Sequence, residues 1–407
     1  MNELTSKYKQ TNNLSQTGSI SQTTTLTNKI GTKYPSTLVC FSHLRWNFVY
    51  QRPQHLISRF ATRFNVFFIE EPVFCGDNEA SLRLTLQEEN LWVVTPHLPH
   101  GTSGDDANRL QKNMLDKFLK NKESDDLLFW YYTPMMMSYS GHYNAGLTVY
   151  DCMDELSAFK DAPAKLKRYE QDLIDKADVV FTGGHSLYKA KKGCHSNIFP
   201  FPSSIDKKHF EQARTITQQP CDQASIAGPR FGFYGVIDER FDIELIRKVA
   251  EARPEWNFIL LGPVVKIDPA TLPRLSNIHY LGGKSYNELP NYLAGWDVAI
   301  IPFAINDSTK YISPTKTPEY LAAGKPVIST AIQDVVSPYG DKGLVEIAPD
   351  AETFIAAGEK LLTMPKKEWL NEVDEFLSHQ SWSLTFKDMM KEIGNTLNSK
   401  FSSTKLQ

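Results

Sequence analysis

The segment at residues 311–330, YISPTKTPEYLAAGKPVIST, decides the fold and is the best starting point. Thr317 is a good N-cap residue, and Pro318 suits the first position of a helix. Gly324 suits the end of that helix, after which KPVIST resumes a strand. The segment therefore predicts a polar loop, a short helix and a buried strand in direct succession.

The start of this helix is a candidate anion site. A helix N-terminus presents free backbone N–H groups and a partial positive charge, and Lys316 beside it adds a full charge. A diphosphate is the ligand expected at such a site. Glu319 falls in the first turn, where it either contacts a ligand or only complements the helix dipole; the spacing alone leaves both readings open.

Outward from this segment, strand-like and helix-like patterns alternate, as in the α/β class. We predict an N-terminal unit at residues 36–205, a polar linker at 206–229, a second unit at 230–382, and a final helix and tail at 383–407. Residues 1–35 form a polar tail without the apolar core of a signal peptide, and we expect them to be disordered. Two tandem units leave a cleft at the carboxyl ends of their strands.

Bulk properties exclude several classes of protein. A length of 407 residues suggests two domains, and a net charge of −3 does not favour a nucleic-acid partner. The chain has five cysteines, an odd number, and no CxxC motif, so neither a disulfide framework nor a structural zinc site is expected. No apolar run is long enough for a transmembrane helix, and reduced thiols fit a cytoplasmic protein.

The start of the second unit supplies further candidates. In FGFYGVIDERF, residues 231–241, a strand ends at Gly235, where the backbone can approach a phosphate closely. Val236 follows it. Arg240 is either a cation for that phosphate or a solvated charge in a polar loop. Further on, Gly262 ends a strand and Gly283 begins the loop after the next strand, while Tyr286 either belongs to that loop's contact surface or packs in the core.

Polar side chains also follow strands in the N-terminal half. The loop HLRWNFVYQR, residues 43–52, comes after the first strand and is either a packed connection or a contact surface for substrate. Asp151 and Asp154 end another strand, where carboxylates serve as bases or hydroxyl ligands, or cap the next helix. The candidates for acceptor contact are His43, Arg45, Trp46, Arg52 and His185, and those for catalysis are Asp151, Asp154, His43, Arg240 and Lys316.

The segment containing Glu319, Gly324, Pro326 and Val327 resembles the donor-binding signature of the retaining glycosyltransferase family four, in the GT-B superfamily. The resemblance implies that Glu319 grips the ribose of the donor and that Arg240 resembles the cation that neutralises the leaving diphosphate. Tyr311 stands where the family has a first Glu, so the chain is a divergent branch. The donor-binding residues implied by these matches are Gly235, Val236, Arg240, Gly262, Gly283, Tyr286, Tyr311, Ser313, Thr315, Lys316, Thr317 and Glu319.

By this resemblance we expect a GT-B fold, with two Rossmann-like domains facing a central cleft and the last helix returning to the first domain. The implied activity is a hexosyltransferase-type transfer, with retention, from a UDP or GDP sugar to a glycan or lipid-linked acceptor in bacterial surface-polysaccharide synthesis. A lipid-linked acceptor would bring the protein to the inner face of the membrane. No Asp-x-Asp occurs, so neither a metal nor another cofactor is expected. A nucleotide-sugar epimerase and a non-catalytic sugar-binding subunit are the alternatives.

Overall fold

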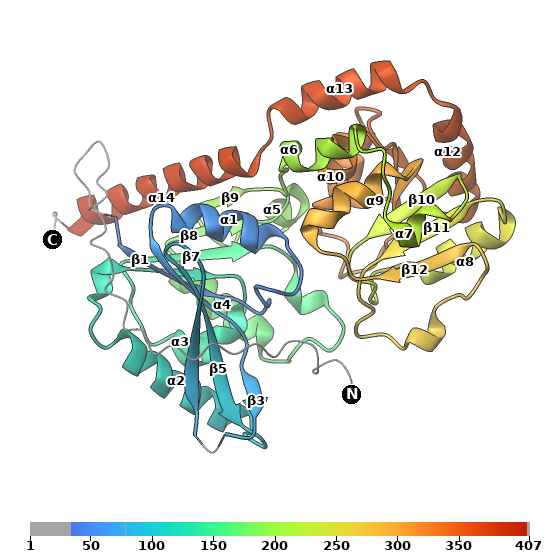
Figure 1. Cartoon of the computed structure of the whole chain (residues 1–407). Coiled ribbons are helices and arrows are strands. Elements are labelled where there is room, and N and C mark those ends of the chain that lie inside the picture. The colour runs from blue at the N-terminus through green and yellow to red at the C-terminus, as the bar shows by residue number, and fades with distance from the viewer. Residues whose placement is uncertain (1–33, 78, 405–407) are drawn as a thin grey trace.

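The computed structural model describes residues 34–77 and 79–404 and has two α/β domains, each built on its own sheet (Figure 1). The tail predicted for residues 1–35 lies almost wholly outside this range, and its predicted disorder is therefore untested. Both sheets consist mainly of parallel strands, as expected for two Rossmann-like domains facing each other. The fold class predicted from the sequence is confirmed.

The N-terminal sheet has the order β3-β5-β2-β1-β6-β7-β8-β9, with β4 added antiparallel to β5. Central strand β1 pairs in parallel with β2 on one side and with β6 on the other. The chain order of the strands reverses at β1, and ligands of such sheets bind at the carboxyl end of the strand at this point. The strands are β1 (Thr37–Phe41), β2 (Asn65–Ile69), β3 (Val73–Cys75), β4 (Ser81–Glu88), β5 (Leu91–Pro99), β6 (Leu127–Tyr131), β7 (Leu147–Cys152), β8 (Val179–Thr182) and β9 (Ile198–Pro200).

The C-terminal sheet has the order β12-β11-β10-β13-β14-β15 and is parallel throughout. Here β10 lies at the reversal point, between β11 and β13, which makes its carboxyl end the natural ligand position. The strands are β10 (Arg230–Tyr234), β11 (Asn257–Leu261), β12 (Ile278–Gly282), β13 (Val298–Ile301), β14 (Val327–Ser329) and β15 (Glu346–Ile347).

Helices cover both faces of the sheets, so the central strands are buried throughout, and their sequences are nearly continuous apolar runs. One face of the N-terminal sheet packs on α1 and α14, and the other packs on α2, α3 and α4. The helices are α1 (Arg52–Ala61), α2 (Gly104–Leu119), α3 (Met137–Ser140), α4 (Leu166–Lys176), α5 (His185–Lys191), α6 (Lys207–Phe210), α7 (Cys221–Ala224), α8 (Ile243–Ala252), α9 (Leu289–Ala294), α10 (Lys316–Ala322), α11 (Gln333–Val335), α12 (Ala351–Thr363), α13 (Lys366–Ser378) and α14 (Trp382–Thr404).

The chain crosses between the domains twice. It first passes from β9 to β10 through α6 and α7, and it returns after α13 into α14, which lies along the N-terminal domain in Figure 1. Trp382, Met389, Ile393 and Leu397 of α14 are buried in the core of that domain. The predicted return of the last helix is confirmed.

Several local predictions were wrong or incomplete. The hairpin strand β4 and helix α2 were not expected from the sequence. Helix α10 begins at Lys316 with Thr315 in the cap position, whereas the sequence suggested Thr317 and Pro318. Gly324 does end this helix, with a φ of +71°. The exact domain boundaries remain a prediction.

Candidate active site

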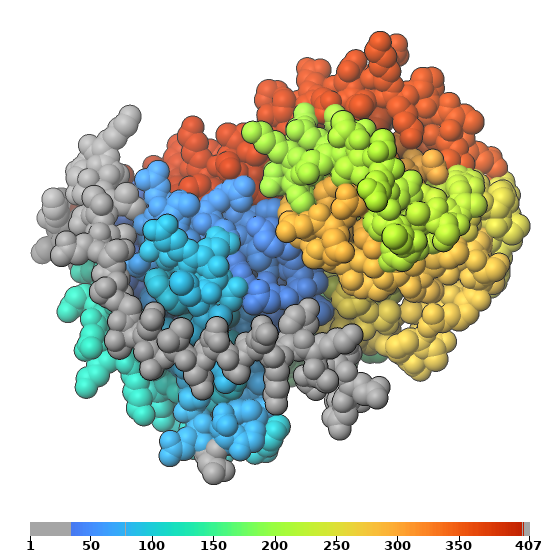
Figure 2. Space-filling model, in the orientation of Figure 1, coloured from blue at the N-terminus to red at the C-terminus, as the bar shows by residue number. Residues whose placement is uncertain are grey.

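A cavity of about 690 Å³ lies between the two domains, at the carboxyl ends of β1 and β10. On the face shown in Figure 2, the two domains pack directly against each other. The N-terminal wall consists of residues 46–52, Met153, Asp154, Gly183 and Ser203. The C-terminal wall consists of Tyr234, Gly235, Val236, Arg240, residues 261–263, residues 283–286, Leu289, Phe303, residues 312–316 and Glu319.

Two glycines make room for a lysine at the centre of the C-terminal wall. A Cβ on Gly235 would stand 2.4 Å from Cε and 2.9 Å from Nζ of Lys316, so the lysine side chain lies directly on this backbone. A Cβ on Gly262 would meet the Gly235 carbonyl oxygen at 1.8 Å. Both glycines have φ near +145°, a conformation that L side chains rarely adopt. The sequence thus places a cation against exposed backbone.

Arg240 lies on the same wall, in the loop before α8. Its guanidinium is held by the Asp238 carboxylate, with Nη2 donating to Oδ2 at 2.6 Å and Nε donating to Oδ1 at 3.0 Å. Phe159 of the N-terminal domain lies 5.4 Å from the guanidinium carbon. The loop therefore fixes the direction of Arg240, which lines the C-terminal wall together with Lys316 from a separate segment.

Glu319 is the buried acid of the cavity. Tyr234, the last residue of β10, donates its hydroxyl hydrogen to Glu319 Oε2, while the Tyr234 backbone N–H donates to the Tyr320 hydroxyl at 3.0 Å. Burial raises the pKa of Glu319, and the Tyr234 hydrogen bond and Lys316 oppose this rise. Burial also lowers the pKa of Lys316 against the attraction of Glu319. An anion bound beside Lys316 would offset that desolvation.

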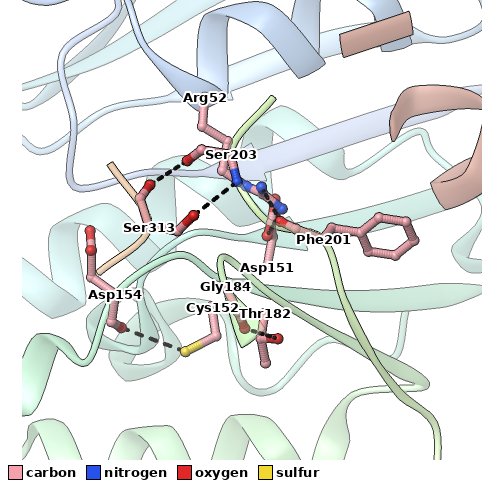
Figure 3. A network of polar contacts seen from close by, with 9 residues as sticks. All are labelled: Arg52, Asp151, Cys152, Asp154, Thr182, Gly184, Phe201, Ser203 and Ser313. Carbon is pink, nitrogen blue, oxygen red and sulfur yellow. Dashed lines mark hydrogen bonds and ion pairs between the residues drawn. The ribbon is translucent and has the colours of Figure 1, made fainter. Parts of the chain in front are cut away.

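Arg52 and Asp151 form a buried ion pair behind the N-terminal wall (Figure 3). Arg52 donates from Nη2 to Oδ1 at 2.8 Å and from Nε to Oδ2 at 3.2 Å, and its Nη1 donates to the Phe201 carbonyl at 2.6 Å. Asp151 has no exposed surface and does not line the cavity. The sequence proposed it as a catalytic carboxylate, but the structure makes it the anchor of Arg52.

Asp154 lines the cavity, unlike Asp151. Burial raises its pKa, against the opposing cations Arg240, Arg52 and Lys316. The alternative role of capping the next helix does not apply, because Glu155 takes the cap position of the 3-10 turn at Leu156–Ala158 and Lys165 that of α4. Asp154 is therefore the N-terminal carboxylate that can meet a bound substrate.

Of the predicted donor-site residues, the cavity brings together Gly235, Val236, Arg240, Gly262, Gly283, Tyr286, Ser313, Thr315, Lys316 and Glu319. Thr317 and Tyr311 are not part of its lining. Thr317 sits inside the first turn of α10 and is fully buried. Tyr311 packs on the core of the N-terminal domain, with the Lys310 ammonium 5.2 Å from its ring. Loop 311–315 therefore faces two ways, and only part of it reaches the cavity.

Of the predicted acceptor-side residues, Trp46 and Arg52 line the cavity, whereas His43, Arg45 and His185 do not. Burial lowers the pKa of His43 to about 4, and its Nδ1 has no partner among the described residues. Arg45 is taken up by the Glu70 carboxylate and the Pro72 carbonyl, each at 3.1 Å. His185 is an exposed residue at the start of α5. Sequence position alone could not show which members of these loops turn inward.

The site also contains residues that were not singled out from the sequence. Ser203 joins the domains, its hydroxyl donating to the Ser313 carbonyl at 2.5 Å and its backbone N–H donating to Ser313 Oγ at 3.3 Å (Figure 3). Tyr50 lies against Tyr286, with ring centroids 4.5 Å apart. Tyr234 could have been suspected, because a tyrosine at the end of a buried strand needs a partner for its hydroxyl.

Residues 228–364 match the family model described as "Glycosyl transferases group 1". This range contains Gly235, Arg240, Lys316 and Glu319. The chain is a glycosyltransferase, and its C-terminal domain is similar to the group 1 family over this range. The assignment to family four is not tested by this match.

A relative of this glycosyltransferase is TuaH of Bacillus subtilis (strain 168), provisionally described as a teichuronic acid biosynthesis glycosyltransferase. The two are 26% identical over 288 residues, which cover 65% of this chain and 71% of TuaH. Among the described residues, no helix is both long and apolar enough to cross a membrane.

Solved structures of other enzymes share the fold. Sucrose-phosphate synthase from Thermosynechococcus elongatus superposes with a TM-score of 0.67 at 14% identity, covering 90% of this chain and 100% of that one. E. coli trehalose-6-phosphate enzyme bound to UDP-2-fluoro glucose gives a TM-score of 0.61 at 12% identity, covering 90% and 98% of the two chains. The catalytic domain of Arabidopsis thaliana starch synthase IV, bound to ADP and acarbose, gives 0.62 at 10% identity, covering 90% and 100%.

Proposed function

We propose that this glycosyltransferase moves a sugar from a nucleoside-diphosphate sugar, held in the interdomain cavity, to an acceptor hydroxyl of a cell-surface glycan. The observation that carries the proposal is that Lys316 packs on the Gly235 backbone and Arg240 lines the same wall of the cavity. Two cations beside open backbone at the end of a central parallel strand form a suitable place for a diphosphate.

In this proposal the diphosphate lies on the cavity side of the Lys316 ammonium and the Gly235 backbone, and Arg240 contacts it from the same wall. Glu319 accepts hydrogen bonds from the ribose hydroxyls, and Tyr234 keeps its carboxylate turned toward the cavity. The base lies along residues 283–286, where Tyr286 is stacked on His209 with ring centroids 4.2 Å apart. UDP and ADP complexes of proteins with the same fold support this class of donor.

The proposed chemistry needs no metal. Negative charge develops on the leaving diphosphate as the glycosidic bond to it breaks, and preorganised cations stabilise that charge without reorganising. Lys316 and Arg240 supply this stabilisation. Asp154, on the facing wall, is placed to contact the acceptor hydroxyl or the donor sugar.

We further propose that transfer proceeds with retention and that the donor carries UDP or GDP. The first family Glu is replaced by Tyr311, which points into the N-terminal domain core. The sugar contacts then fall to Ser313 and Thr315, which do line the cavity. The acceptor would enter along the N-terminal wall at Trp46 and Arg52. The similarity to TuaH favours a cell-wall glycan as the acceptor. We propose that this glycan is a growing or lipid-linked chain at the inner face of the membrane.

A thermal-shift screen of the full chain with UDP, GDP, ADP and TDP, with and without magnesium, tests the donor site. A nucleotide at 100 times its Kd stabilises the folded state by about 2.7 kcal/mol. We expect one nucleotide to raise the unfolding midpoint without magnesium, and Arg240→Ala to abolish the rise. A shift that appears only with magnesium would contradict the metal-free mechanism.

The matching nucleotide sugars are then offered with glycan acceptors, and the anomeric configuration of the product is read by NMR. Product with the anomeric configuration of the donor supports retention, and inverted product rejects it. Epimerised donor formed without acceptor would reject transfer as the main activity.

A further inference from the structure

We propose that Cys75, Asp77 and His97 form a binding site for a divalent transition-metal ion, for which Zn²⁺ is the probe. One potential ligand atom from each side chain lies within 4.8 Å of the other two. The site is on the β3–β5 edge of the N-terminal sheet, away from the cavity between the domains. Among the described residues, these three side chains of metal-ligand type lie outside the donor cavity, and the pairing of the strands brings them together.

Strand register brings the residues together. In the parallel pair β3–β5, Cys75 stands opposite Pro99, and Val73 opposite His97. Side chains two positions apart share a face of the sheet, so Cys75 and His97 project to the same side. Leu98, between them in register, points to the other side and packs with Ala107 and Met114 of α2. Asp77 follows Cys75 by two residues and brings the third potential ligand to the cluster.

The chemistry of the three ligands is matched to a borderline transition metal. Thiolate and imidazole select zinc-like ions over magnesium and calcium, and a carboxylate is a common further ligand. The Cys75 thiol donates to Asp77 Oδ2 at 3.3 Å, and the metal would replace the hydrogen in that contact. On binding, the thiol proton is released to solvent and the sulfur bonds the ion as thiolate.

The His97 ring supplies an independent observation. It is half-buried, and the structure assigns it no hydrogen-bond partner among the residues it describes. A partly buried imidazole with unused nitrogens beside a thiol and a carboxylate is available for coordination. Three protein ligands leave one position of a tetrahedral ion for water.

The ion would brace the edge of the sheet that supports the cavity loop. Glu70 accepts from the Thr95 hydroxyl at 3.2 Å, from Arg45 at 3.1 Å and from the Trp46 backbone N–H at 2.6 Å. Thr95 is two residues before His97 on the same face of β5. The role of the metal is therefore structural, and the proposal is independent of the donor chemistry.

The direct test is zinc binding by the EDTA-treated full chain, measured as bound zinc per chain after dialysis against Zn²⁺. We expect one ion per chain in the wild type. Loss of a residue that only hydrogen-bonds to a metal ligand weakens metal binding roughly 10- to 100-fold, and Cys75→Ser and His97→Gln, which remove the ligands themselves, should weaken it by more. Cys194→Ser and His100→Gln change an exposed cysteine and an exposed histidine outside the cluster and should bind as the wild type does. Equal binding by all variants, or none by the wild type, overturns the proposal.

A second measurement needs no substitution. Zn²⁺ should protect Cys75 from alkylation, located by mass spectrometry, while the exposed Cys194 and Cys221 react at unchanged rates. Co²⁺ in place of Zn²⁺ should give a thiolate-to-cobalt charge-transfer band in the near ultraviolet. Unprotected Cys75 at saturating Zn²⁺ would reject thiolate ligation, even if some ion were retained.

Discussion

At the scale of single residues, substitution of Lys316 on the cavity wall distinguishes diphosphate binding from a purely structural role. Lys316→Ala removes a cation that the proposal places on the diphosphate. Hydrogen bonds to charged groups contribute about 1.5–3 kcal/mol, so we expect nucleotide affinity to fall roughly 10- to 100-fold. Lys310→Ala, which removes a neighbouring lysine outside the cavity lining, is the matched control for calorimetric titration. Equal affinities in both variants would refute the placement of the diphosphate.

Asp154, on the N-terminal wall of the cavity, should lower the free energy of unfolding at neutral pH. Burial raises the folded-state pKa of Asp154 above its unfolded value, so the stability it contributes at low pH is lost as pH rises through the folded pKa. Asp154→Asn should therefore unfold at a higher temperature than the wild type at pH 7, with the difference closing toward about pH 4, where an unperturbed aspartate protonates.

The same variant should lose activity. If Asp154 contacts the reacting groups, the acid limb of the rate profile lies above the ordinary aspartate range, and Asp154→Asn removes that limb. Full activity with an unchanged acid limb in the variant would exclude Asp154 from the reaction.

The other aspartate of this strand end should behave in the opposite way. Asp151→Asn leaves the buried Arg52 guanidinium without its counter-charge, and breaking such a pair costs about 3–5 kcal/mol. Asp106→Asn removes an exposed pairing with Arg109 and should cost no more than about 1 kcal/mol. Urea unfolding measures both. A stable but inactive Asp151→Asn protein would instead restore Asp151 to the chemistry.

These two aspartates show what the sequence could and could not decide. Both were recognisable as carboxylates at a strand end, where ligands bind. Which one faces the cavity depends on Arg52, which is 99 positions earlier in the chain. In the same way Arg45 is diverted by Glu70 and Tyr311 by the N-terminal core. Long-range partners of this kind leave no local pattern to read.

At the scale of secondary-structure elements, the strand-to-loop turns after β10 and β11 shape the donor site. Gly262→Ala forces a left-handed φ on alanine and drives its Cβ into the Gly235 carbonyl. We expect a loss of about 1–3 kcal/mol in stability and weaker nucleotide binding. Gly283→Ala is the control on the same wall, because a Cβ there meets nothing within 4 Å. Similar midpoints in the two variants would show that the turn relaxes without cost.

Elements with strong patterns were predictable, and those defined by tertiary contact were not. The apolar runs of the central strands and the Pro-Val strand after Gly324 gave correct positions. Helix α10 starts earlier than its best capping residues suggest, since Thr315 takes the cap position without a side-chain hydrogen bond. The metal cluster was not expected because the sequence lacks a CxxC, whereas its ligands are assembled by pairing between β3 and β5.

At the scale of the whole molecule, α14 belongs to the core of the domain that it rejoins. Ile393 is fully buried there, and Ile393→Ala should destabilise the protein by about 2–5 kcal/mol. Leu384→Ala, on the same helix but 42% exposed, should change stability little. Chemical denaturation monitored by circular dichroism compares them. Equal midpoints would mean that the helix lies on the surface without contributing to the fold.

The return of α14 also has a mechanical consequence. The two passages between the domains lie side by side. The backbone N–H of Trp382, at the start of α14, donates to the carbonyl of Ile205, just before α6, and Lys207 of α6 pairs with Asp374 of α13. We expect any opening of the cavity to be a rotation about this paired connection, so that each closure returns Asp154 to the same place opposite Lys316.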